Sequence, residues 1–180
     1  MAKKIIIVIV TILIICLLVF AGFSIYKYVT PVTVTASDNS FSLTLPGKLN
    51  IKETASGSSE YILDLYSLKD EMMLYTTKFE KSVDINLEDI INSDKDGLAE
   101  IKENVRDVSD TSTIDIPNTE SYKYTFTYHD STLNSDLYSE VVWISTDKNI
   151  YILDFEVVTE NKDKYVETFD EIAKTFVENN

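Results

Sequence analysis

Hydrophobic and polar residues alternate with a period of two in several short segments of the chain. The early segments are Phe41–Leu45, Tyr61–Ser67 and Met73–Glu80, and the later ones are residues 111–116, 121–129, 137–146 and 150–158. Such alternation between turn-forming residues is typical of β-strands with one buried face. We therefore expect an antiparallel sheet whose strands come from two parts of the chain.

Between the two groups of strands, the hydrophobic period changes to that of a helix. Apolar residues recur at spacings of three, four or seven from Leu87 to Val105, with Gly97 as a weak point. A similar stripe predicts a C-terminal helix over Lys162–Val177. This order of elements predicts an α+β domain, an antiparallel sheet with helices on both faces, because both faces of the last two strands are partly apolar and need cover.

The last hairpin turns at residues 146–149, and its register decides which side chains share a face. Asn149 suits a left-handed position, so we expect a G1 bulge that pairs Thr146 with Ile150. This register puts Val141 and Trp143 on the face of Tyr151 and Leu153. It groups three carboxylates on the opposite face: Glu140, Asp154 and Glu156.

Four aromatic rings alternate along the segment 121–129, at Tyr122, Tyr124, Phe126 and Tyr128. They form either a platform for a ligand or part of the core. We expect them to join the Trp143 face beneath a helix, because burying such a ring contributes roughly 1.5–3 kcal/mol.

The N-terminus is apolar in a different way. Residues 5–23 form an almost uniformly apolar run of about 19 residues, which as a helix would span about 28 Å, close to the hydrocarbon thickness of a bilayer. Lys3 and Lys4 precede it, so we expect a single-pass anchor with a cytoplasmic N-terminus and an extracellular domain. The predicted division is an anchor at 1–30, a linker at 31–39 and a domain at 40–180.

Two other interpretations of this N-terminal segment are possible from the sequence. Val19-Phe-Ala21 could be a signal-peptide cleavage site, which would release a secreted domain. Cys16 could be lipidated, but Ile15 before it is larger than the small residue that this processing prefers.

Charge and composition exclude several functions. Beyond Pro31 the chain has no cysteine, and its 13 Lys and Arg residues against 30 Asp and Glu give a formal charge of −17, which argues against binding nucleic acid. His129 is the single histidine and the chain has four glycines, so a histidine-rich zinc site and a glycine-rich phosphate loop are excluded. We expect no cofactor.

One segment matches a metal-binding pattern. Asp94, Asp96, Gly97 and Glu103 occupy the third, fifth, sixth and twelfth positions of an EF-hand calcium loop that would begin at Asn92, where the pattern has Asp. The alternative is a solvated helix face, which we favour because the apolar stripe continues across the supposed loop.

The expected cluster of Glu140, Asp154 and Glu156 is the second candidate site. Like charges opposite one another are destabilising unless they are neutralised, and Lys123 on the neighbouring strand could do this. A bound cation or acid–base catalysis by a hydrolase are the alternatives.

The chain resembles the PsbP-like superfamily in its pattern. The resemblance covers about residues 41–176 and includes FSLTLPGKLN, SYKYTFTY, VVWISTDKNIYILDFEV and YVETFDEIAKTF. It implies an α/β/α sandwich in proteins that are often exported or lipid-anchored and seldom enzymes, and it transfers no site residues. We therefore expect a membrane-anchored accessory domain that binds a protein or peptide partner.

Overall fold

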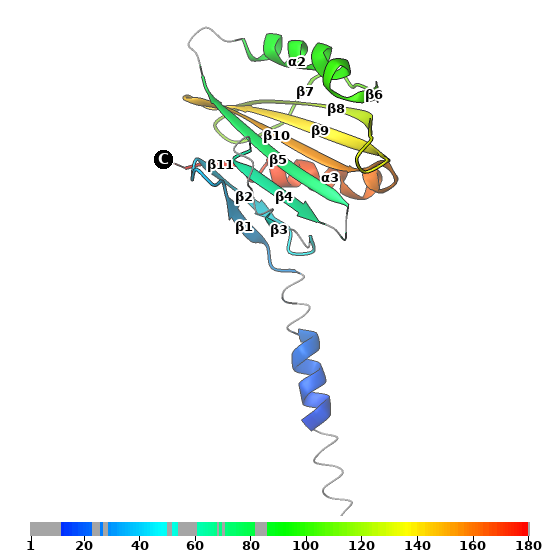
Figure 1. The fold of residues 1–180 in the computed structure, drawn as a ribbon. Coiled ribbons are helices and arrows are strands. Elements are labelled where there is room, and N and C mark those ends of the chain that lie inside the picture. The colour runs from blue at the N-terminus through cyan, green and yellow to red at the C-terminus, as the bar shows by residue number, and fades with distance from the viewer. Residues whose placement is uncertain are drawn as a thin grey trace, which may run out of the picture.

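The computed structural model describes residues 12–22, 26, 29–49, 52–53, 61–67, 69, 71–81 and 86–179 (Figure 1). The helical elements of the domain are α2 (Leu87–Ile101), the short 3₁₀ helix η1 (Thr159–Asn161) and α3 (Lys162–Ala173). The strands are β1 (Val32–Thr35), β2 (Phe41–Leu45), β3 (Lys52–Glu53), β4 (Leu63–Ser67), β5 (Met72–Glu80), β6 (Glu103–Arg106), β7 (Ser112–Thr113), β8 (Glu120–Asp130), β9 (Ser135–Ser145), β10 (Asn149–Val158) and β11 (Val177–Glu178).

Residues 12–22 are helical and exposed, and they lie apart from the domain (Figure 1). Within the described part of the chain, no helix is long and apolar enough to cross a membrane. The rest of the expected span, residues 5–11 and 23, lies outside the described residues. The anchor therefore stays a prediction.

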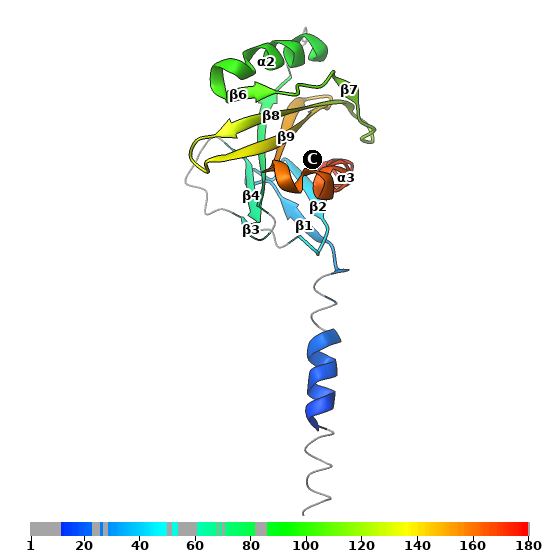
Figure 2. The same ribbon diagram turned by 90° about the vertical axis from the view of Figure 1, so that its right-hand side faces the viewer.

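The large sheet has eight strands and is antiparallel. Its order is β3-β4-β5-β10-β9-β8-β6, with β7 also pairing with β8, and a small sheet of order β1-β2-β11 lies beside it. Figure 2 shows α2 on one face of the large sheet and α3 on the other. The predicted α+β architecture, with helices on both faces of an antiparallel sheet, is confirmed.

Each face of the large sheet has its own hydrophobic core. Beneath α3 and the small sheet, Tyr151, Leu153 and Phe155 of β10 pack with Phe169 and Phe176. Beneath α2, the core is built by Leu87, Ile91 and Leu98 together with the aromatic residues of β8 and with Trp143.

The aromatic ladder of β8 belongs to the core under α2, as expected. Tyr124 and Phe126 are 1% exposed and Tyr128 is 3% exposed. Tyr122 is half-buried and pairs with Trp143 of the neighbouring strand β9. Successive rings from Tyr124 to Tyr128 lie 6.0 and 5.7 Å apart. The interpretation of these rings as core is confirmed.

Both helices end earlier than their apolar stripes indicate. α2 stops at Ile101 because Lys102 is extended, and Val105 falls in β6, where Asn104 has a φ of 52°. α3 stops at Ala173, and the following residues form β11, which pairs with β2. The stretch expected to be a linker, residues 31–39, contains β1, which pairs with β2 along all four of its residues.

The register of the last hairpin differs from the expected one by a single residue. Ile150 pairs with Ser145, not with Thr146, and Asn149 is not left-handed. The Thr146 hydroxyl accepts hydrogen bonds from the Lys148 and Asn149 amides at 3.4 and 3.1 Å, which closes a two-residue turn without a bulge. Because side chains alternate along a strand, this shift moves every residue of β10 to the other face relative to β9.

Candidate functional site

The segment matched to a calcium loop is helical through Ile101, since α2 passes through Gly97 without a break. Asp94 accepts a hydrogen bond from the Tyr124 hydroxyl at 2.5 Å, Asp96 is exposed, and Glu103 lies beyond the helix in β6. The three carboxylates therefore do not converge, because the unbroken helix points Asp94 and Asp96 to different sides of its axis and Glu103 lies beyond its end. In the parts of the chain that the structure describes, no group of three or more His, Cys, Asp or Glu side chains could hold a metal ion.

We expect millimolar calcium to leave the melting temperature of the protein unchanged within about a degree. A ligand present at 100 times its Kd would stabilise the fold by about 2.7 kcal/mol, which thermal unfolding would reveal. An upward shift that Glu103→Gln abolishes would contradict this expectation and restore the EF-hand interpretation.

The expected cluster of Glu140, Asp154 and Glu156 is not formed, because the one-residue shift divides it between the two faces. Glu140 pairs with Phe155 and is buried on the α3 face. Asp154 and Glu156 lie on the α2 face, where they pair with Val141 and Ser139. The hydrolase hypothesis required all three in one cleft, and the geometry does not provide it.

Lys123 does lie beside Glu140, as predicted. Its ammonium is 3.6 Å from Glu140 Oε2 and donates a hydrogen bond to Asp170 at 2.5 Å. Neither carboxylate oxygen of Glu140 has a hydrogen-bond partner among the described residues. Burial raises the pKa of Glu140 to about 7, with Lys123 opposing the shift and the charge of Asp170 adding to it.

The two carboxylates on the α2 face have different partners. Glu156 accepts hydrogen bonds from the Tyr128 hydroxyl at 2.7 Å and from the Lys102 ammonium at 3.1 Å. Asp154 accepts one from Ser139 at 2.6 Å, and burial followed by the charge of Glu156 raises its pKa. The α2 face thus carries negative charge next to its hydrophobic core.

Part of this face is not covered by α2. Figures 1 and 2 show α2 over the β8 and β6 end of the sheet, away from β4. On β4 and on β5 as far as Thr76, the α3-side residues are buried, whereas their neighbours on the α2 side remain half-buried or exposed. We call this surface the open sheet face; it consists of Asp64, Tyr66, Met73, Tyr75, Thr77, Phe79, Ile152 and Asp154.

A pocket of about 550 Å³ lies at one end of the open sheet face, next to the turn between β8 and β9. We call it the turn pocket. It is lined by Asp64, Tyr66, Ser67, Glu71, Met72, Met73, Tyr75, Leu133, Ser135, Leu137 and Val158. This volume is typical of sites for small ligands.

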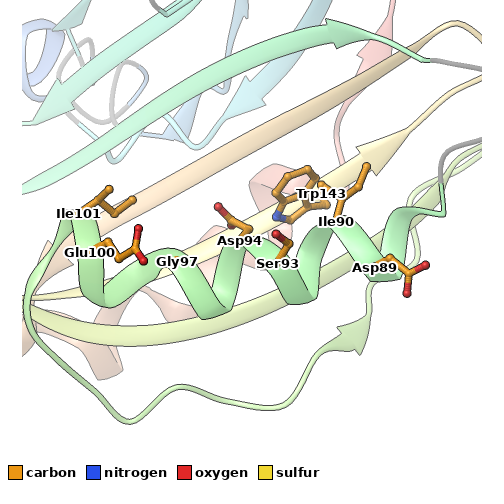
Figure 3. Close-up of a pocket in the computed structure, with 8 residues that line it drawn as sticks. All are labelled: Asp89, Ile90, Ser93, Asp94, Gly97, Glu100, Ile101 and Trp143. Atoms are coloured by element: carbon orange, nitrogen blue, oxygen red, sulfur yellow. The ribbon is translucent and has the colours of Figure 1, made fainter.

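A shallower groove runs beside α2 (Figure 3). Trp143 is 2% exposed, and its indole nitrogen, which has no hydrogen-bond partner among the described residues, faces the Ser93 and Asp94 side of the helix. Ile101 is 71% exposed at the end of the groove, and Asp89 and Glu100 give its wall negative charge. Phe79 of the open sheet face lies 6.3 Å from Trp143, ring centre to ring centre.

No model of a known protein family matches the chain, and no curated protein matches its sequence. Solved structures do match. CyanoP, the cyanobacterial PsbP of Synechocystis, has a TM-score of 0.61 at 11% identity over 83% of this chain and 93% of its own. The fold is PsbP-like. LpqN of Mycobacterium tuberculosis, involved in cell envelope biogenesis, has a TM-score of 0.59 at 10% identity over 87% of this chain and 95% of its own.

A protein of unknown function from Pseudomonas aeruginosa extends the comparison, with a TM-score of 0.53 at 10% identity over 83% of this chain and 98% of its own. Identities this low establish the PsbP-like fold and leave the function to be argued from the site. In this PsbP-like domain, the site residues that sequence reasoning missed are those of the open sheet face other than Asp154, which was predicted as part of the carboxylate cluster. The sequence pattern could have indicated this surface, because LDLYS and MMLYTTKF carry apolar or aromatic residues on both faces of their strands.

Proposed function

We propose that the protein is a membrane-anchored accessory domain that binds a protein or peptide partner outside the cytoplasm, through the open sheet face. The observation that carries this proposal is the aromatic and apolar surface on β4 and β5, where Phe79 is exposed and Tyr66, Met73 and Tyr75 are half-buried. The turn pocket and the groove beside α2 flank this surface. Exposed apolar surface of this kind, rimmed by polar residues, is characteristic of interaction sites. The PsbP-like fold of CyanoP and LpqN supports an accessory role.

Catalysis is not part of the proposal. The three carboxylates considered for a hydrolase lie on two faces of the sheet, and each of the two on the α2 face is bound by neighbouring side chains. The acidic surface and the apolar floor favour recognition over reaction chemistry. The expected partner segment combines large apolar side chains with positive charge, because it must complement a domain with a formal charge of −17.

The anchor and the orientation are tested together. We expect protease added to intact cells to remove the domain that follows Pro31, and we expect the domain to remain with the membrane fraction when no protease is added. The measurement is immunodetection of a C-terminal tag in cells, membranes and medium. A soluble domain in the medium whose N-terminus is Gly22 would show that the segment is a cleaved signal peptide.

The partner surface is tested by capture from intact membranes with the full-length chain. Phe79 and Ile101 are 42% and 71% exposed, so we expect Phe79→Ser with Ile101→Ser to leave folding intact and to reduce recovery of a crosslinked partner at least about tenfold. The control is Val32→Ser on β1, an apolar residue of the small sheet whose exposed fraction, 54%, lies between those of Phe79 and Ile101. Loss of the partner in the control, with retention in the double variant, would move the interface away from the open sheet face.

A further inference from the structure

The turn pocket has an unusual combination of lining residues. Its walls carry two carboxylates, Asp64 and Glu71, and two phenol rings, Tyr66 and Tyr75, and none of its described lining residues is Lys, Arg or His. The remaining lining is mostly apolar, with two methionines and three aliphatic residues. The pocket therefore combines apolar, aromatic and acidic side chains, and Glu71 accepts a hydrogen bond from the Asn161 amide at 3.3 Å.

The strand register places negative charge on both sides of Tyr75. Asp64 of β4 pairs with Tyr75 on one side and Asp154 of β10 pairs with it on the other. Burial, followed by the charges of Glu156, Asp64 and Asp154, raises the pKa of the Tyr75 hydroxyl. The negative charges that contribute to this shift, unlike the burial, also favour a cation at this position.

Elsewhere on the same face, a lysine of the domain itself lies between an aromatic ring and a carboxylate. The Lys102 ammonium lies 4.2 Å from the centre of the Tyr128 ring and 3.1 Å from the Glu156 carboxylate. On the other face, Lys162 lies 4.6 Å from the Tyr138 ring centre. An ammonium between an aromatic face and a carboxylate is stabilised by both, and it keeps its aliphatic chain on apolar surface.

We propose that the turn pocket binds an alkylammonium cation. The ammonium lies against the Tyr75 ring between the carboxylates of Asp64 and Glu71, and the alkyl chain contacts Met73 and Leu137. The cation is supplied either by a free amine or by a lysine side chain of the partner; the second source rests on the proposed function. An anionic or uncharged chain of equal length lacks the attraction to both carboxylates.

The three methionines of the chain give a direct readout, since Met72 and Met73 line the pocket and Met1 is at the N-terminus. The full chain, labelled at the methionine methyl groups and held in a neutral detergent, is titrated with n-butylammonium, 1-butanol or pentanoate and followed by NMR. We expect n-butylammonium to shift the Met72 and Met73 methyl signals saturably, with a Kd about tenfold below those of the other two probes.

Two conservative variants test the carboxylates. Asp64→Asn and Glu71→Gln each weaken n-butylammonium binding about fivefold, whereas Glu167→Gln, which removes the same charge from the exposed face of α3, leaves it unchanged. The dispersion of the remaining signals reports folding. If a variant does not fold, the carboxylates are tested by the salt dependence of binding to the wild-type protein. Raising the NaCl concentration is expected to weaken binding of n-butylammonium and not of 1-butanol.

The proposal is overturned if the three probes bind equally well, which would make the pocket simply apolar, or if none shifts the two methyl signals saturably. A second titration, with acetylated Leu-Lys-Leu amide, identifies the source: tighter binding than n-butylammonium indicates a partner's lysine, and weaker binding indicates a free amine. A negative result in the cation titration would not contradict the proposed function, because the partner-capture experiment depends on Phe79 and Ile101, which do not line the turn pocket.

Discussion

Replacing Phe126 by alanine is expected to lower the free energy of unfolding by about 3–5 kcal/mol. The ring is 1% exposed and lies between Tyr124 and Tyr128 beneath α2, so its removal leaves a cavity in the core on that face. Tyr124→Ala is expected to cost a similar amount. Urea unfolding of the full chain in detergent, followed by the fluorescence of Trp143, measures the change.

Phe79→Ala serves as the control for this prediction, because the Phe79 side chain is 42% exposed and its loss is expected to cost less than about 1 kcal/mol. A cost below about 0.5 kcal/mol for Phe126→Ala, in a protein that remains folded, would contradict the assignment of the ladder to the core. The rings would then have to be considered again as a surface for a ligand.

Replacing Glu140 by glutamine is expected to stabilise the protein at pH 8 and to have little effect at pH 4. The ordinary pKa of a glutamate is 4.5 and burial raises that of Glu140 to about 7, so between these values the folded protein holds a proton that the unfolded chain releases. The free energy of unfolding therefore falls as the pH rises through this window, by about 3 kcal/mol in total, and is lower by that amount above pH 7.

Glu140→Gln lacks this loss, so the difference in stability between variant and wild type should grow from pH 4.5 to pH 7 and then remain constant. Lys123 keeps Asp170 as a partner at 2.5 Å, so the variant leaves no unpaired ammonium. Glu167→Gln on the exposed face of α3 provides the matched control. A difference between the Glu140 variant and the wild type that does not change with pH would show that the pKa of Glu140 is the same in the folded and unfolded protein, so that burial does not raise it.

The architecture of this domain follows from local patterns in the sequence. The strand Phe41–Leu45 and the ladder of β8 were predicted because alternation and ring spacing are properties of a few consecutive residues. The pairing of the ladder with the Trp143 face was also predicted, since the hydrophobic faces of β8 and β9 can be buried together in only one register.

The candidate site could not be predicted in the same way. The turn at residues 146–149 is held by the Thr146 hydroxyl, which in turn donates a hydrogen bond at 2.9 Å to Glu178 of β11, 32 residues away. A sequence pattern does not show such a contact, and without it a bulge at Asn149 is equally reasonable. The shift of one residue places Glu140 on one face of the sheet and Asp154 and Glu156 on the other, so the predicted site does not form.

The small sheet has a mechanical consequence. β1 is the first strand after the N-terminal segment, so a force between that segment and the domain enters at Val32 and stretches the hydrogen bonds between β1 and β2. β2 is also paired with β11, and Phe41, Leu43 and Leu45 are buried in the α3-side core independently of β1. In the membrane-anchored protein that we propose, β1 would therefore separate from β2 under tension and lengthen the link to the anchor, while β2, β11 and the open sheet face keep their places.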